Sequence, residues 1–340
     1  MPSITITEVA QLAGVSIKTV SRVLNAEPHV REEVRQRVFK AAGELNYRPQ
    51  VSARSLAGAR SYIVGFLMTV PSPYAAGAQG GALDACRRLG RHLLVESLDL
   101  EAPDLATEVD ALASTLPVEG VILLAPACDS EVVMDALDRQ GVPYVRIAPA
   151  KMPERSFSVE VDDEQAAYVM TRLLLELGHR RIGFIRGLED HSASTRRLQG
   201  FRRGLAELGL EAREPLVQPG QFIFASGQEA ATRLLASPEP PTAIFASNDL
   251  MAFGVMSKAR ELGYRIPDDL SVSGFDDIPL AGMIWPGLTT MAQPLAEMAF
   301  AAAEAVIAGA ARAPLAPSSS HPLFKCRLVV RGSTAPPRTG

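Results

Sequence analysis

A regular alternation of apolar runs and amphipathic stretches constrains this chain more than any other feature. From Ser61 onward, short runs rich in Val, Ile and Leu alternate with segments of helical periodicity. Within each of two sets, successive runs begin 22 to 34 residues apart, the length of one βα unit. The pattern therefore predicts two doubly wound parallel sheets. Their strands are expected to begin near Tyr62, His92, Gly120 and Val142, and then near Arg181, Pro215, Thr242 and Leu270.

Three further short stretches lie between or after these sets, and they suit crossings between two subdomains: Ser158–Val161, Leu288–Met291 and Phe324–Val329. An enzyme with a dinucleotide-binding fold is the natural rival for a βα chain. No GxGxxG follows the first strand, Tyr62–Met68, and neither a P-loop motif nor a GxSxG elbow occurs in the sequence. The usual signatures of that class are missing.

Composition and charge add two constraints. Of the 340 residues 47% are hydrophobic, so global disorder is excluded. The formal charge of −4 argues against a protein coated in positive charge, but it is unevenly spread. The first 60 residues hold nine basic and five acidic side chains, a charge of +4, and the other 280 carry −8. This asymmetry favours a small anion-binding module on an acidic body, although a solvated helical surface would also account for it.

Cysteine usage predicts neither a disulfide framework nor a metal site. Cys86, Cys128 and Cys326 are odd in number and far apart, with no CxxC spacing and no His cluster nearby. The start of the chain lacks the pattern of a signal peptide, and no run of eighteen apolar residues occurs. We therefore expect a cytoplasmic protein with no membrane span, no metal and no cofactor.

Three short helices are predicted in the first 46 residues. Thr5 and Glu8 have the spacing of a capping box, Gly14 suits the turn after the first helix, and Ser16 suits the cap of the second. The second helix is expected from Ile17 to Leu24 and the third from about Glu32 to Leu45. Helix, tight turn and helix form the arrangement whose second helix lies in the major groove. The expected core positions are Val9, Leu12, Ala13, Val20, Val23 or Leu24, Val34, Val38 and Ala41 or Ala42.

Four segments in order carry a family resemblance: TITEVAQLAGVSIKTVSRVLN, HVREEVRQRV, LNYRP and ARSLAG. Together they resemble the DNA-binding head of the lac/galactose repressor family of bacterial transcription regulators, and the similarity continues to about residue 332. The resemblance implies an all-α helix-turn-helix head, joined by a hinge helix to an α/β body of two doubly wound parallel-sheet subdomains, like a periplasmic binding protein. The implied domains are 1–47 for DNA binding, 48–60 for the hinge or linker, and 61–340 for effector binding and dimerisation. Its subdomains would be about 61–161 plus 292–322, and about 162–291 plus 323–340.

The resemblance also implies which residues contact DNA. Ile17, Lys18 and Arg22 match the positions that read base edges, where the two cations can donate to guanine and Ile17 can contact a thymine methyl. Leu56 matches a leucine that wedges into the minor groove when two hinges pair, although it could equally be an ordinary linker residue. Arg31 departs from the family pattern, because a small capping hydroxyl is usual there. The remaining implied contacts are Thr5, Ser16, Thr19, Ser21, Asn25, His29 and Ala53.

Candidate effector residues gather where predicted strands end. Arg197 matches the family's effector-binding arginine, whose fixed donors can span neighbouring sugar hydroxyls, although a helix-start salt bridge is the alternative. Asn248 and Asp276 are preferred as ligand groups over Asp249 and Asp277. These two are expected to be structural, Asp249 as the cap of the helix that starts there and Asp277 as a cap before Ile278. The other candidates are Phe222 and Tyr74 for stacking and His191 for reaching the cleft.

Two positions qualify this prediction. Trp285 is a further stacking candidate, although a core role is the favoured interpretation. The family often has an aspartate near position 148, where this chain has Ala148, so one half of the pocket is left undefined.

Adjacent carboxylates such as Asp276 and Asp277 rarely flank one glycosidic bond, so glycoside hydrolysis has little support.

The function predicted from the sequence is that of a homodimeric transcription repressor. It would bind a palindromic operator and be released by a small-molecule inducer, a sugar, with carbohydrate-utilisation genes as targets. A corepressor-dependent regulator and a sugar-binding protein with no DNA role are the alternatives. An enzyme would show turnover, which the sequence does not predict.

Overall fold

The computed structural model describes residues 4–24, 30–45, 47, 61–115, 118–152, 154–189, 191–309 and 322–338. The chain divides into two units, Met1–Tyr62 and Ile63–Gly340. Within the described residues, no helix is long and apolar enough to cross a membrane.

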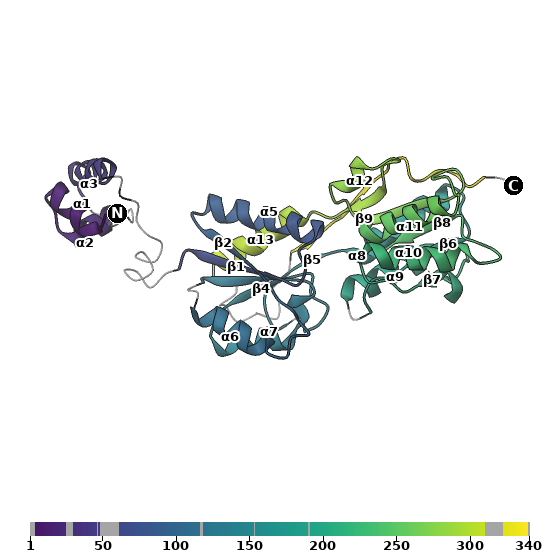
Figure 1. The fold of residues 1–340 in the computed structure, drawn as a ribbon, viewed down its shortest axis with the longest axis horizontal. Coiled ribbons are helices and arrows are strands. Elements are labelled where there is room, and N and C mark those ends of the chain that lie inside the picture. The colour runs from purple at the N-terminus through teal and green to yellow at the C-terminus, as the bar shows by residue number, and fades with distance from the viewer. Residues whose placement is uncertain are drawn as a thin grey trace. The chain divides into compact units, whose positions relative to one another are not determined.

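The first unit contains the three predicted helices, α1 (Ile6–Ala13), α2 (Ile17–Leu24) and α3 (Glu32–Glu44) (Figure 1). Glu8 accepts hydrogen bonds from the backbone N–H and the hydroxyl of Thr5, at 2.7 and 3.0 Å. Gly14 adopts a left-handed φ of 63° in the turn, where a side chain would be strained. At the start of α2 the Ser16 hydroxyl accepts from the Thr19 backbone N–H. The sequence predicted both turn features.

The core of this unit differs from the prediction at one position. Val9, Val20 and Val38 are fully buried, as expected, and Ala41 and Ala42 pack with them. Leu12 was expected inside but is 51% exposed, and Ala10 is buried instead. Two turns of helix bury too few residues to fix which face points inward. Arg31 precedes α3 and makes no side-chain cap bond, which agrees with the loss of a capping hydroxyl predicted there.

The second unit contains two six-stranded sheets. The first has the order β11-β5-β4-β3-β1-β2 and all its pairs are parallel. Apolar side chains alternate along its strands, so that Phe66 packs under α5 and α13 while Leu67 packs under α6 and α7. Figure 1 shows these helix pairs on opposite faces. The elements are β1 (Ile63–Met68), α5 (Pro73–Arg88), β2 (His92–Ser97), α6 (Leu105–Thr115), β3 (Gly120–Leu124), η1 (Ala127–Asp129), α7 (Glu131–Arg139), β4 (Tyr144–Ile147), β5 (Ser158–Val161), α13 (Leu295–Ile307) and β11 (Leu323–Phe324).

The second sheet has the order β12-β10-β9-β8-β6-β7, parallel except for the antiparallel pair β10 and β12. One face is covered by α8 and α9 and the other by α10 and α11. The elements are α8 (Asp163–Glu176), β6 (Ile182–Ile185), α9 (Ser192–Ala206), η2 (Glu214–Leu216), β7 (Val217–Gln218), α10 (Phe224–Leu235), β8 (Ala243–Ala246), α11 (Asp249–Glu261), β9 (Ser271–Asp276), α12 (Leu280–Met283), β10 (Thr289–Ala292) and β12 (Arg327–Val329). The predicted doubly wound body is therefore present, with strand starts within two residues of expectation.

The chain passes between the two sheets three times: after β5, after β10, and between β11 and β12. The last crossing falls later than expected. Leu323 and Phe324 pair with Glu160 and Val161 in the first sheet, whereas the sequence assigned everything from residue 323 to the second subdomain. A strand of two residues carries no periodicity, so its partner is decided by packing and not by local pattern.

Candidate functional site

The outward face of α2 holds the residues expected to read DNA bases. Ile17, Lys18 and Arg22 are exposed, while Val20 and Val23 on the same helix are buried. This division follows from helical periodicity, because positions 17, 18, 21 and 22 lie along one face. An exposed isoleucine beside two cations suits a groove with thymine methyls and guanine acceptors better than it suits bulk water.

The other expected DNA contacts divide into two groups. Thr5, Ser16 and Thr19 already hold helix ends, since Ser16 and Thr19 bond to each other at 2.9 Å and Thr5 bonds to Glu8. Ser21 is partly buried beside them on α2. The rest of the implied set lies outside the described residues, as does the expected hinge at 48–60: Asn25, His29, Ala53 and Leu56.

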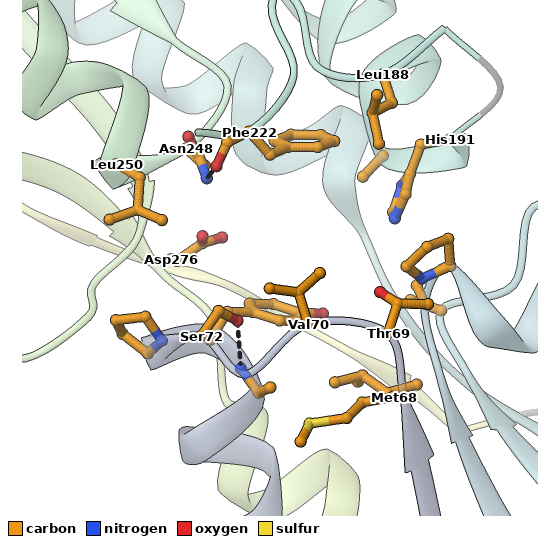
Figure 2. A pocket seen from close by; sticks show the side chains of 18 of the residues that line it. Met68, Thr69, Val70, Ser72, Leu188, His191, Phe222, Asn248, Leu250 and Asp276 are labelled. Atoms are coloured by element: carbon orange, nitrogen blue, oxygen red, sulfur yellow. Dashed lines mark hydrogen bonds between the residues drawn. The ribbon is translucent and has the colours of Figure 1, made fainter. Parts of the chain in front are cut away.

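A cavity of about 340 Å³ lies at the carboxyl ends of the strands of both sheets, within the usual size range of ligand clefts. Loops after β1, β3 and β4 line it from the first sheet, and loops after β6, β7, β8 and β9 line it from the second. Figure 2 shows side chains from both groups of loops pointing into it. The cavity brings together six of the effector candidates that the sequence offered: Tyr74, His191, Arg197, Phe222, Asn248 and Asp276.

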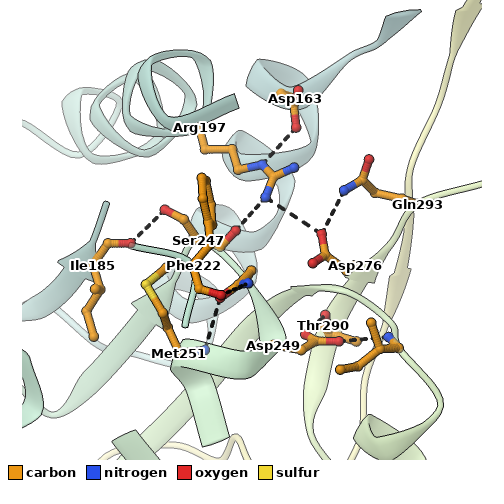
Figure 3. Close-up of polar contacts among 12 residues, drawn as sticks. Asp163, Ile185, Arg197, Phe222, Ser247, Asp249, Met251, Asp276, Thr290 and Gln293 are labelled. Atoms are coloured by element: carbon orange, nitrogen blue, oxygen red, sulfur yellow. Dashed lines mark hydrogen bonds and ion pairs between the residues drawn. The ribbon is translucent and has the colours of Figure 1, made fainter. Parts of the chain in front are cut away.

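Arg197 is the centre of a buried polar network at one end of the cavity (Figure 3). Its Nε donates to Asp163 Oδ1 at 2.8 Å, and one terminal nitrogen donates to the Ser247 carbonyl and lies 3.7 Å from Asp276 Oδ1. The guanidinium carbon sits 3.6 Å from the centre of the Phe275 ring. Burial opposes its charge, but Asp163 and Asp276 outweigh burial and the pKa of Arg197 is raised. The cation is fixed in place before any ligand arrives.

Asp276 is the last residue of β9, and its carboxylate is the second acidic partner of Arg197, after Asp163. Gln293, from the crossing segment after β10, donates through Nε2 to Asp276 Oδ1 at 2.7 Å. Burial raises the pKa of Asp276 to about 7, against the lowering influence of Arg197 and Gln293. The carbonyl Oε1 of Gln293 is buried and has no hydrogen-bond partner among the described residues, although Gln293 lines the cavity. This orphaned acceptor is available to a ligand hydroxyl.

Asn248 lines the cavity and also caps a helix. Its Oδ1 accepts from the Met251 backbone N–H and so caps α11, and its Nδ2 donates to the Phe222 carbonyl at 2.9 Å. The sequence expected Asp249 to be that cap. Asp249 is instead buried beneath it, where it accepts from Thr290 Oγ1 and from the Ile278 backbone N–H. Asp277 pairs with Arg331 and does not cap a helix, so both neighbouring carboxylates have structural partners, but neither is the expected cap.

Phe222 forms a fixed wall. Its backbone has a left-handed φ of 60°, and its ring lies so close to Gly187 that a Cβ there would come within 1.9 Å of it. The His191 ring meets it edge to face at 5.3 Å between centroids, and the buried Nδ1 of His191 has no partner among the described residues. Burial, and then the charge of Arg197, lower the pKa of His191, so the imidazole is neutral near pH 7.

Backbone strain concentrates at this cavity. Of the five non-glycine residues with positive φ in the described part of the chain, Ala148, Phe222 and Asp276 line it, and Met152 and Asp277 do not. Such conformations cost about 1–3 kcal/mol each and persist where the surroundings hold them for a functional reason. The strain marks the cavity as a functional site independently of any resemblance.

The remaining expectations have mixed outcomes. Tyr74 lines the cavity, and burial followed by the charge of Asp276 raises its pKa well above the ordinary value, so its hydroxyl stays neutral. Trp285 is 87% exposed and does not line the cavity, so both interpretations offered for it, stacking and core packing, are wrong. No cluster of metal-ligating side chains occurs in the described part of the chain. Sequence reasoning missed Asp163 and Gln293, which stand at two of the crossings.

Each of the two units matches a known protein family. Residues 5–50 match the model for "Bacterial regulatory proteins, lacI family", and residues 171–334 match that for a "Periplasmic binding protein-like domain". The regulator DegA of Bacillus subtilis is 34% identical over 98% of this chain and 99% of its own length. The repressor CytR of Escherichia coli is 33% identical over 97% of this chain and 96% of its own. A lac repressor dimer bound to operator and an anti-inducer superimposes with a TM-score of 0.83, at 26% identity over 98% of this chain and 100% of that chain.

A helix-turn-helix unit and a body with a ligand-sized cleft define the class of ligand-responsive DNA-binding regulators. The chain belongs to the lacI family of bacterial regulatory proteins. It is therefore a transcription regulator and not an enzyme.

Proposed function

We propose that this regulator is a homodimeric repressor of carbohydrate-utilisation genes, released from a palindromic operator when a sugar or a related hydroxylated molecule occupies the cleft. The observation that carries the effector half is the buried network of Arg197, Asp276 and Gln293 at one end of a single cavity. Its fixed donors and acceptors match the alternating demands of neighbouring hydroxyls. A solved relative complexed with cellobiose, 30% identical with a TM-score of 0.72, supports this choice of ligand class.

The DNA half of the proposal rests on α2. Ile17, Lys18 and Arg22 would contact base edges, and the hydroxyl residues around them would contact phosphates. One short recognition helix reads only a half-site, so two copies are needed for a palindrome. We assign residues 1–47 to DNA binding, 48–60 to a hinge and 61–340 to effector binding and dimerisation, with Leu56 as the minor-groove wedge.

The proposed mechanism couples the cleft to the operator. Ligand binding draws the two lobes together, the lobes containing the first sheet reorient across the dimer, and the paired hinges no longer fit the minor groove. This coupling is typically about 1–3 kcal/mol and is reciprocal, so operator DNA weakens ligand binding by the same factor.

The DNA assignment is tested by fluorescence anisotropy with DNA from the promoter region upstream of the protein's own gene. Arg22→Ala should weaken specific binding by about 1–3 kcal/mol and relax the preference over random DNA. The matched control is Arg37→Ala, which removes another exposed arginine, from α3, and should lower specific and random binding alike. If the two variants keep the same specificity ratio as the natural protein, α2 is not the recognition helix.

A further inference from the structure

Carboxylates outnumber cations at the buried end of the cavity. Arg197 is the only lysine or arginine that lines the cavity in the part of the chain that the structure describes, whereas the carboxylates of Asp163 and Asp276 both line it. These three side chains are only 2–7% exposed. The histidine in the lining, His191, is neutral near pH 7 and adds no charge. The lining therefore holds one negative charge in excess when both acids are ionised.

A third carboxylate, that of Asp249, acts on the same group of charges. It is fully buried, makes no ion pair with any described residue, and interacts with Asp276. Burial, and then the charge of Asp276, raise the pKa of Asp249 well above its ordinary value. Burial also raises the pKa of Asp276 to about 7, although Arg197 and Gln293 lower it. One arginine is thus too little positive charge to offset the burial of these acids.

Three acceptor oxygens at this end have no hydrogen-bond partner among the described residues. One is Oε1 of Gln293, whose amide nitrogen donates to Asp276 (Figure 3). The second is Oδ2 of Asp276, because the contacts from Gln293 and Arg197 both go to its Oδ1. The third is Oδ2 of Asp163, whose Oδ1 accepts from Arg197 Nε. A ligand group that enters this end must therefore donate hydrogen bonds.

An ammonium group matches this end of the cavity in charge and in hydrogen bonding. It carries one positive charge, three N–H donors and no acceptor. A hydroxyl has a single donor and leaves the excess charge in place, and a phosphate or carboxylate would add negative charge beside the acids. The outer part of the lining is different, because its polar groups include the exposed amide of Gln221 and the hydroxyl of Thr69, which carry no charge. Those groups suit ligand hydroxyls.

We propose that the ligand of this cleft carries a protonated amine beside its hydroxyl groups, as an amino sugar does. The inference rests on the proposed function, whose ligand class it narrows. The ammonium lies among Asp163, Asp276 and Gln293 and donates to their three unpartnered oxygens, and the hydroxyl groups extend toward Gln221 and Thr69. The ligand thus supplies the second cation that two lining carboxylates need.

The test uses the full chain and probes that differ at one group. Affinities are measured by calorimetry at about pH 6.5, below the ordinary pKa of an amine. The probes are glucose, galactose and mannose, their amino sugars with the amine at carbon 2 or carbon 6, and the N-acetyl form of each amino sugar. We expect at least one amino sugar to bind about tenfold or more tightly than both its parent sugar and its N-acetyl form, because charge-assisted hydrogen bonds are the stronger ones. Glucuronate, an acidic probe, should not bind.

Asp163→Asn locates the effect. The amide keeps an acceptor for Arg197 Nε but removes the excess charge, so the ratio of amino-sugar to parent-sugar affinity should fall toward one. Asp162→Asn is the matched control, because it removes a carboxylate one residue away that does not line the cavity. Asp162 caps α8 by accepting from the Gln165 N–H, and asparagine caps equally well, so this variant should leave the ratio unchanged.

The ligand class would be overturned if no amino sugar bound, if every amino sugar bound no more tightly than its parent sugar, or if glucuronate bound more tightly than the amino sugars. A ratio that survives Asp163→Asn, or that falls equally in both variants, would place the amine elsewhere and overturn the site. Tight binding of an uncharged sugar would contradict this inference and still support the proposed regulator, whose operator binding is measured separately with the ligand-free protein.

Discussion

The two walls of the cleft are built from similar βα units, yet the second sheet contributes buried charge where the first contributes methyl and ring groups. Arg197 and Asp276 are nearly inaccessible and each makes hydrogen bonds or ion pairs, while Val70 and Ala148, which line the cavity from the first sheet, bring no polar side-chain atom. The difference indicates that the two walls have different roles. One wall is preorganised to recognise the ligand, and the other is a surface that can close over it.

The largest expected effect comes from removing the centre of the polar wall. Arg197→Ala leaves the carboxylates of Asp163 and Asp276 buried without their cation, and should lower the free energy of unfolding by about 3–5 kcal/mol and abolish the ligand response. Arg196→Ala is the neighbouring control, because Arg196 is half-exposed and pairs with Glu160 at 3.4 Å; about 1 kcal/mol or less is expected there. The free energies of unfolding of both variants are measured by urea denaturation. Equal losses in both variants would mean that the buried network contributes no more than a surface pair.

The titration of Asp276 offers a second test. Its pKa is raised by burial to about 7 in the folded protein, above the ordinary value of 3.8, so the folded state holds a proton that the unfolded state has lost. Its contribution to stability is present below about pH 4 and is lost as the pH rises toward 7, on the order of a few kcal/mol. Asp276→Asn cannot titrate. The melting temperature of the natural protein should therefore fall relative to that of the variant between pH 5 and pH 8. Parallel pH profiles would show that the carboxylate is not desolvated.

A smaller loss is expected where the fixed aromatic wall is disturbed. Gly187→Ala places a methyl group within 1.9 Å of the Phe222 ring and should displace the ring, at a cost of about 1–3 kcal/mol of stability together with ligand affinity. Gly80→Ala, in α5 where a Cβ would meet nothing within 4 Å, should stabilise by about 0.5–1 kcal/mol. Thermal unfolding of both proteins distinguishes a crowded site from a general effect of alanine.

The apolar wall should tolerate change best. Val70→Thr alters an exposed side chain of nearly the same shape, so the free energy of unfolding should stay within about 0.5 kcal/mol of the natural value. Affinity for a sugar should also change little, because Val70 brings no polar side-chain atom to the cavity. A large destabilisation, measured by the same urea titration, would show that the first wall contributes as much to folding as the second.

Much of this architecture is predictable from the sequence because it depends on local pattern. Gly14 and Ser16 mark a turn by their own chemistry, and Arg197 and Asp276 follow apolar runs whose spacing defines a βα fold. The carboxyl ends of parallel strands meet at one edge, so residues placed after strands converge even when far apart in sequence. That rule and the family resemblance together identified six lining residues.

The missed features depend on contacts between distant segments. Asp163 and Gln293 reach the cavity from the crossings, whose position follows from how the two sheets pair. Trp285 is exposed although its type favours burial, because the short segment after α12 packs through Ile284 and leaves the indole outside. Asn248 and Asp249 are adjacent, and either side chain could cap α11. Asn248 is the cap, because Asp249 accepts a hydrogen bond from the buried hydroxyl of Thr290, far along the chain. Local pattern does not encode these choices.

The most direct measurement of the central claim is operator affinity with and without the sugar that binds the chain most tightly in a thermal-shift screen. Fluorescence anisotropy should show operator binding weakened about 5- to 150-fold by the ligand in the natural protein, and unchanged by it in Arg197→Ala at the same concentration. An operator affinity that does not respond to a ligand bound in the cleft, or that rises with it, would contradict the proposal that occupation of this cleft releases the DNA.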